Sequence, residues 1–152
     1  MSGQERKFKY RLESLVKLRS AERDALKNDV ERASGEVQKR TRERDDIERT
    51  IELAEDELRA LYRGGADLSL DAQSRLQLYL RQQRGLRSAK QRELEEATRV
   101  MQAVLCALEL KVQDTKALEK HRDRQRRQFD DVQTRVTLHA ADEQWLRRKQ
   151  EI

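Results

Sequence analysis

Proline is absent from the 152 residues, and glycine occurs only five times. Because both residues interrupt helices, their scarcity favours long, unbroken helices. Aromatic residues make up 4% of the chain and apolar residues 36%, against 41% charged residues, so a thick globular core is excluded. The chain is instead rich in good helix formers, which predicts long helices that bury a narrow apolar seam.

Cysteine is equally scarce. The single residue Cys106 excludes an internal disulfide, and we therefore expect a reducing, cytoplasmic location. The sequence contains no run of 18 apolar residues, so no membrane span is predicted. The opening residues MSGQERKFKYRLESL lack the apolar core of a signal peptide. The net charge of +5 weakly indicates an acidic partner. Without stacking aromatics or a recognisable binding motif, we expect no nucleic-acid partner.

Two seams with alternating spacings of three and four residues predict helices that pack against each other. Nine of the eleven positions in the first seam are apolar: Leu26, Val30, Ala33, Val37, Arg40, Arg44, Ile47, Ile51, Ala54, Leu58 and Leu61. The second seam begins with Leu76 and Leu80 and continues from Leu94 through Met101, Leu108, Thr115, Leu118, Phe129 and Val136 to Leu146.

The adjacent Gly64 and Gly65 separate these seams. Glycine commonly ends helices, and Asp67 or Ser69 could cap the next one. The sequence predicts one coiled-coil domain over residues 1–152, with a helix at about 6–62, a turn at 63–69 and a helix at about 70–150.

Charge selects an antiparallel arrangement. Residues 43–58 hold eight acidic and two basic side chains, whereas residues 75–92 hold six basic and no acidic ones. Folding at the glycines places residue i near residue 131 − i and brings the two blocks together, while a parallel dimer would oppose like charges. The fold class predicted is all-α: an antiparallel two-helix coiled-coil hairpin with a longer second helix.

The longer second helix leaves apolar side chains without a partner beyond about residue 125, and this end is either a fraying tail or a docking site. Residues 100–112, VMQAVLCALELKV, are apolar on more than one side. These residues pack either against a partner or a second copy of the chain, or within a locally thick core. A candidate partner patch comprises Val100, Leu105, Cys106 and Trp145.

No residue pattern indicates catalysis. His121 and His139 are isolated from other metal ligands, and a narrow helical pair has no concave pocket that could desolvate its carboxylates. We therefore expect no enzyme, no catalytic residues, no cofactor and no metal.

Three stretches together resemble the FliJ/YscO family of flagellar and injectisome type III secretion proteins. They are the opening Phe8–Arg19 (FKYRLESLVKLR), the glycine turn followed by Tyr79, Leu86 and Ala89, and Lys116–Gln125 (KALEKHRDRQ). The resemblance implies an antiparallel two-helix stalk, monomeric and cytoplasmic, peripherally associated with the inner-membrane export apparatus. Its implied partners are the export ATPase hexamer, the cytoplasmic domain of the membrane export gate, and export chaperones.

Two sites follow from this resemblance. The end away from the glycines is basic on both strands, and its candidate contacts with the ATPase ring are Arg6, Lys7, Lys9, Arg11, Arg122 and Arg124. Candidate contacts with the export gate are Tyr79, Leu86 and Ala89. The alternative function is a self-associating structural coiled-coil scaffold unrelated to export.

Overall fold

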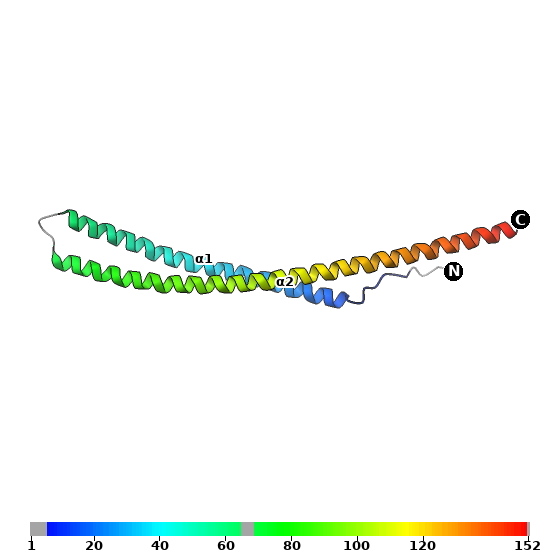
Figure 1. The fold of residues 1–152 in the computed structure, drawn as a ribbon, viewed down its shortest axis with the longest axis horizontal. Helices are drawn as coiled ribbons and strands as arrows, with labels where there is room; N and C mark the ends of the chain where they lie inside the picture. Colours follow the sequence, from blue (N-terminus) through cyan, green and yellow to red (C-terminus); the bar gives the residue numbers. More distant parts are fainter. Residues whose placement is uncertain (1–5, 65–68, 152) are drawn as a thin grey trace. The chain divides into compact units, whose positions relative to one another are not determined.

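The computed structural model describes residues 6–64 and 69–151, which form two helices and, over those residues, no strand (Figure 1). Helix α1 spans Glu13–Arg63 with 51 residues, and helix α2 spans Leu70–Gln150 with 81 residues. The predicted all-α hairpin with a longer second helix is confirmed. Neither described helix contains a stretch apolar enough to traverse a bilayer.

The start of α1 differs from the prediction. The helix begins at Glu13 rather than near residue 6, and residues 6–12, here called the lead segment, lie outside it. Phe8 and Tyr10 are spaced by two, so an extended chain directs both rings to one side, whereas a helix would separate them. Both rings pack against α2, and this packing favours the non-helical start. Helix α2 begins and ends as predicted.

The turn carries clear helix-ending and helix-starting contacts. The Gly64 amide donates to the Ala60 carbonyl at 3.2 Å, which extends the last turn of α1. The Ser69 hydroxyl accepts a bond from the Ala72 amide at 3.2 Å, which confirms it as the N-cap of α2. Gly65 and Asp67, the other residues implicated in the turn, lie outside the described residues.

The chain divides into two compact units. Met1–Asp24 and Glu109–Ile152 form the first unit, and Ala25–Leu108 form the second. Each unit contains a stretch of α1 and a stretch of α2.

A small apolar core lies in the second unit. Ile51 and Leu80 are 2% and 3% exposed, and they pack with Ala54, Ile47 and Leu58. All eleven positions of the first predicted seam are buried or half-buried, including Arg40 and Arg44. The heptad interpretation of residues 26–61 is therefore confirmed.

The opposed charge blocks of the second unit form ion pairs across the helices. Arg84 and Arg87 contact Glu55 and Glu48 at 2.9 and 3.2 Å. A third pair joins Lys90 to Glu43 at 3.3 Å. These contacts confirm the antiparallel arrangement that the charge pattern predicted.

The predicted register needs a small correction. The numbers of paired residues sum to 133 for Glu43 and Lys90, to 135 for Glu48 and Arg87 and to 139 for Glu55 and Arg84, rather than to 131. Because α1 ends at Arg63 and α2 begins at Leu70, the midpoint between the helices lies later than the predicted one, which fell directly after the glycine pair. The shift is at most about two helical turns for these pairs, so each acidic side chain still meets the basic block.

The first unit has a thinner core. Val16 is buried, and the buried Thr115 hydroxyl donates to the Lys111 carbonyl at 2.8 Å. Lys111 also pairs with Glu22 across the helices at 2.7 Å.

Beyond this core, α2 continues without α1 beside it. The N-terminal part of the chain packs along α2 further than predicted. Phe8 of the lead segment contacts Phe129, whereas pairing was expected to end near residue 125. Residues 130–150, here called the arm, remain helical. Its large apolar side chains are each more than half exposed: Val132, Val136, Leu138, Trp145 and Leu146.

Candidate functional site

The lead segment is fastened to α2 by its aromatic side chains. The Phe8 and Phe129 ring centroids lie 5.6 Å apart. The Tyr10 hydroxyl lies 2.6 Å from His121 Nδ1 and 3.5 Å from the Leu118 carbonyl. Residues more than 100 positions apart in the sequence are thereby joined at one end of the first unit.

The same alternation directs basic side chains to solvent. Lys7, Lys9 and Arg11 are exposed, whereas Phe8 and Tyr10, which alternate with them, are half-buried. Exposure alternates along residues 7–11, so one side of the segment packs on α2 and the other presents positive charge. Sequence reasoning found both residue types, but its helical assignment of this segment missed that separation.

The six candidate ring contacts all belong to the first unit. Arg6 and Arg124 are exposed. Arg122 is half-buried and lies 3.8 Å from Glu13, so it also links the two helices. We call this positive surface of the lead segment and residues 116–127 of α2 the basic end, and it can attract an acidic surface over a Debye length of about 10 Å at 0.1 M salt.

The three candidate gate contacts lie on α2 in the second unit. Tyr79, Leu86 and Ala89 are all exposed. Tyr79 and Leu86 are seven residues apart and therefore share a helix face. Their role at a gate stays a prediction.

The candidate partner patch is divided between the units. Val100, Leu105 and Cys106 are exposed in the second unit, which makes Cys106 a surface thiol. Trp145 belongs to the first unit, where Lys149 Nζ lies 4.3 Å from its ring centroid. Within residues 100–112, Val100, Leu105 and Leu110 are exposed, whereas Met101 and Leu108 are half-buried, so a partner at this surface stays a prediction.

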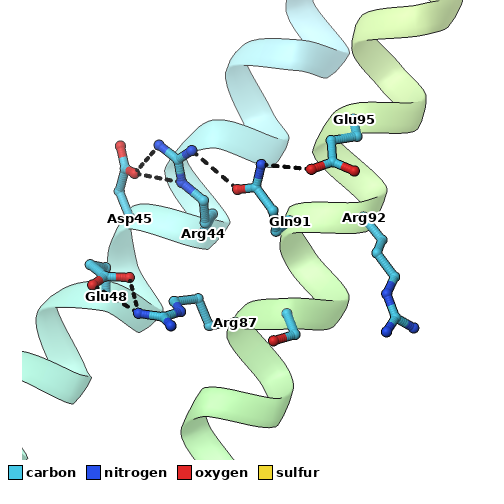
Figure 2. Close-up of a pocket in the computed structure, with 8 residues that line it drawn as sticks. Arg44, Asp45, Glu48, Arg87, Gln91, Arg92 and Glu95 are labelled. Carbon is cyan, nitrogen blue, oxygen red and sulfur yellow. Dashed lines mark hydrogen bonds and ion pairs between the residues drawn. The ribbon is translucent and has the colours of Figure 1, made fainter.

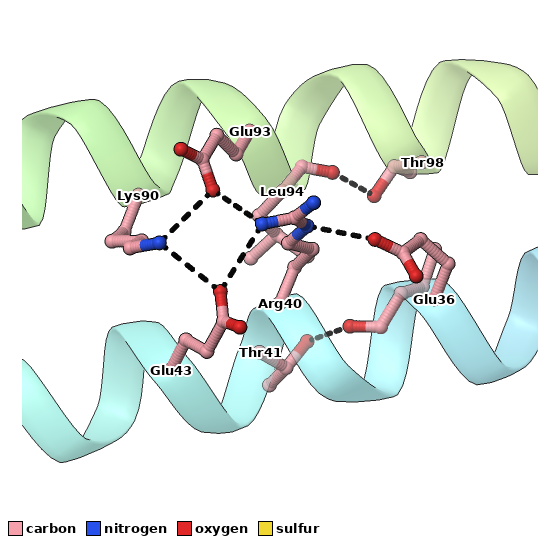
Figure 3. Close-up of polar contacts among 9 residues, drawn as sticks. Glu36, Arg40, Thr41, Glu43, Lys90, Glu93, Leu94 and Thr98 are labelled. Carbon is pink, nitrogen blue, oxygen red and sulfur yellow. Dashed lines mark hydrogen bonds and ion pairs between the residues drawn. The ribbon is translucent and has the colours of Figure 1, made fainter.

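Sequence reasoning missed an ionic cluster in the second unit (Figure 3). Arg40 donates to Glu36 and Glu93 at 2.9 and 2.7 Å, and Lys90 contacts both Glu43 and Glu93. The available signal was the pair of arginines inside the first seam. A buried seam position accepts a charge when carboxylates from both helices surround it.

Ion pairs within and between the helices shift the pKa values of Glu43 and Lys90 in the second unit and of Glu22 in the first unit. The hydrogen bond from Lys90 lowers the pKa of Glu43, and the bonds to Glu93 and Glu43 raise the pKa of Lys90. In the first unit, the bonds from Lys111 and Arg19 lower the pKa of Glu22.

A polar groove beside the cluster is also internally bonded (Figure 2). Arg44 donates to Gln91 at 3.3 Å, and Gln91 donates to Glu95 at 3.1 Å. Arg87 faces Glu48 in the same groove. These side chains hold the helices together, which is a structural use of charge. Across the described residues, no three His, Cys, Asp or Glu side chains are grouped as metal ligands.

Comparison with known proteins gives no relative. No family model, no curated protein and no solved structure matches the chain.

Proposed function

We propose that this chain is the non-enzymatic stalk of a type III export apparatus, flagellar or injectisome. In this role it enters the export ATPase ring, promotes ring assembly and activity, connects the ring to the membrane export gate and handles export chaperones. The proposal rests on the resemblance to the FliJ/YscO family, and the helical hairpin is compatible with it.

One observation carries the proposal furthest. Two of the three stretches that resemble the family, residues 8–19 and 116–125, pack against each other in the first unit. Tyr10 meets His121, and Glu13 meets Arg122. These two stretches therefore lie side by side in the first unit, which supports the proposal, while the third stretch with Tyr79, Leu86 and Ala89 lies in the second unit.

The basic end supplies the physical mechanism. A ring lined by acidic side chains would attract it before contact and orient the hairpin, because complementary charge raises association rates. Exposed charges act in this way without being needed for the fold. Such a mechanism predicts stimulation of the ATPase that weakens as salt is added.

The test measures ATP hydrolysis by the purified export ATPase across a salt series. We expect the wild-type chain to stimulate hydrolysis and the triple variant Arg6→Glu, Lys7→Glu, Arg124→Glu to lose most of that stimulation at low salt. The matched control reverses Lys39, Arg81 and Arg92, which are exposed in the second unit, and changes the net charge equally. Arg122 is left intact, since it contacts Glu13.

Equal stimulation by the two triple variants would exclude the charge mechanism. A wild-type chain that never stimulates would instead favour the self-associating scaffold. Light scattering separates these functions further, because the stalk is expected to be monomeric and the scaffold dimeric or larger.

A further inference from the structure

A groove runs between the lead segment and α2 in the first unit, with a volume of about 860 Å³. Its apolar lining, here called the floor, comprises Phe8, Tyr10 and Leu12 from the lead segment and Phe129 and Val132 from α2, and the polar side chains of His121, Gln125 and Gln128 also line the groove. Leu12 and Val132 are 38% and 55% exposed, so apolar surface remains uncovered within the groove.

The groove arises because the partner of α2 changes from a helix to a non-helical segment. Helix α1 begins at Glu13, and the lead segment that precedes it lies along α2 as far as Phe129. A single non-helical chain is narrower than a helix about 10 Å wide, so it covers less of the seam. The groove therefore continues an established apolar interface and has room for a further chain segment.

The rim of the groove is basic. Lys9 and Arg11 line it and are exposed. Residues 6–11 contain four basic and no acidic side chains, and residues 116–127 of α2 contain six basic and two acidic ones. A ligand in the groove thus meets apolar carbon at its base and positive charge at its edge.

We propose that this groove docks an acidic amphipathic segment of a partner protein. Its apolar side chains enter between Leu12 and Val132, and its carboxylates meet Lys9 and Arg11. The apolar floor supplies affinity, while the charges supply orientation and association rate. This docking uses Lys9 and Arg11, which are also candidate ring contacts, but it requires no ATPase and is measured on the chain alone.

The shape of the groove favours a peptide over a nucleic acid. Bases bind by stacking on open aromatic faces. Here the Phe8 and Phe129 rings are half-buried and tilted against each other by 52°, so they form a floor. A recess flanked by two chain segments accepts the branched side chains of an amphipathic helix.

The experiment uses the full chain and a fluorescein-labelled peptide of 15 residues, composed of leucine and glutamate, with leucines at helical spacings of three and four. Fluorescence anisotropy measures binding at low salt. We expect saturable binding, at least tenfold weaker for a scrambled peptide of the same composition. A peptide with lysine in place of glutamate should bind at least tenfold more weakly.

Variants then locate the site. Val132→Glu changes an exposed side chain, and Lys9→Glu with Arg11→Glu reverses the rim; each should weaken binding at least tenfold. The matched controls on the arm, Val136→Glu and Arg147→Glu with Arg148→Glu, should bind as wild type does. Circular dichroism confirms that every variant keeps its helical content.

Three results would overturn the proposal. They are equal binding of the scrambled peptide, wild-type binding by Val132→Glu, and tighter binding of single-stranded oligothymidine or phosphatidylglycerol vesicles than of the peptide. Because no ATPase is present, failure here leaves the stalk proposal standing. Failure of ATPase stimulation likewise leaves the groove intact.

Discussion

The two units use charge differently. The second unit contains 16 basic and 16 acidic residues, whereas the first contains 18 basic and 13 acidic, so the first carries the whole net charge of +5. In the second unit the charges meet across the helices, at Arg84 with Glu55 and Arg87 with Glu48. In the first unit, aromatic side chains hold the lead segment, Lys111 and Arg122 pair with Glu22 and Glu13, and the excess basic side chains, such as Lys7, Lys9 and Arg11, are exposed. Charge is therefore balanced in the second unit, whereas the first unit keeps a surplus that is available to a partner.

The largest expected effect is on the free energy of unfolding, and it should distinguish the core of the second unit from the arm. Ile51→Ala removes a side chain that is 2% exposed, and we expect a loss of about 2–4 kcal/mol in the free energy of unfolding. Leu146→Ala changes a side chain that is 54% exposed, and its effect should stay within about 0.5 kcal/mol. Urea unfolding followed by far-ultraviolet circular dichroism measures both. Similar losses would show that the arm is covered in solution.

A smaller loss of stability is expected when the ion pairs between the two helices are reversed, and it tests whether charge selects the antiparallel pairing. Arg84→Glu with Arg87→Glu opposes like charges, which should cost on the order of 1 kcal/mol in low salt. Adding Glu48→Arg and Glu55→Arg should recover most of the loss, because the pairs are re-formed with opposite sign. In the first unit, Arg147→Glu with Arg148→Glu should leave the stability unchanged. If the fourfold variant is no more stable than the double variant, these ion pairs do not select the arrangement.

The smallest effect is on pH dependence, and here the units should behave alike. The folded-state pKa values of Glu22 and Glu43 are lowered, so their stabilisation is present above the unfolded value of about 4.3 and is lost as pH falls through the folded value. The pKa of Lys90 is raised, so its contribution is present below about 10.4 and is lost as pH rises through the folded value.

Stability should therefore be greatest from about pH 5 to 10. Glu22→Gln and Glu43→Gln should each make the acid-side fall shallower in urea unfolding measured at several pH values. A change with Glu43→Gln alone would mean that Glu22 and Lys111 do not pair in solution.

The sequence predicted the features that depend on periodicity and net charge. The seam from Leu26 to Leu61 and the opposed blocks were both recognisable, because each repeats over many residues. The start at Glu13 was missed because Phe8 and Tyr10 act through a contact with distant residues of α2. The register was displaced because the glycine pair marks a turn without fixing its centre.

The candidate site was predictable only in part. The basic residues on both strands at the end away from the glycines were identified from the sequence and the predicted pairing. The groove was not predicted, because it requires the lead segment to be non-helical, and a heptad pattern cannot show where a helix gives way to another conformation. The cluster around Arg40 was also missed, because the partners of a charged side chain depend on which carboxylates lie within one helical turn on both helices.

The distance in sequence between paired residues has a consequence for the order of folding. Tyr62 and Gln73 meet across 11 residues, Glu43 and Lys90 across 47, and Tyr10 and His121 across 111. Since the entropy lost on closing a chain loop grows with its length, pairing beside the turn should nucleate and then zip outward. The contacts of the lead segment, Tyr10 with His121 and Phe8 with Phe129, would close last and open first, so this segment would be the earliest part to detach in native-state hydrogen exchange. A newly made chain could complete both contacts only after residue 129 had been synthesised.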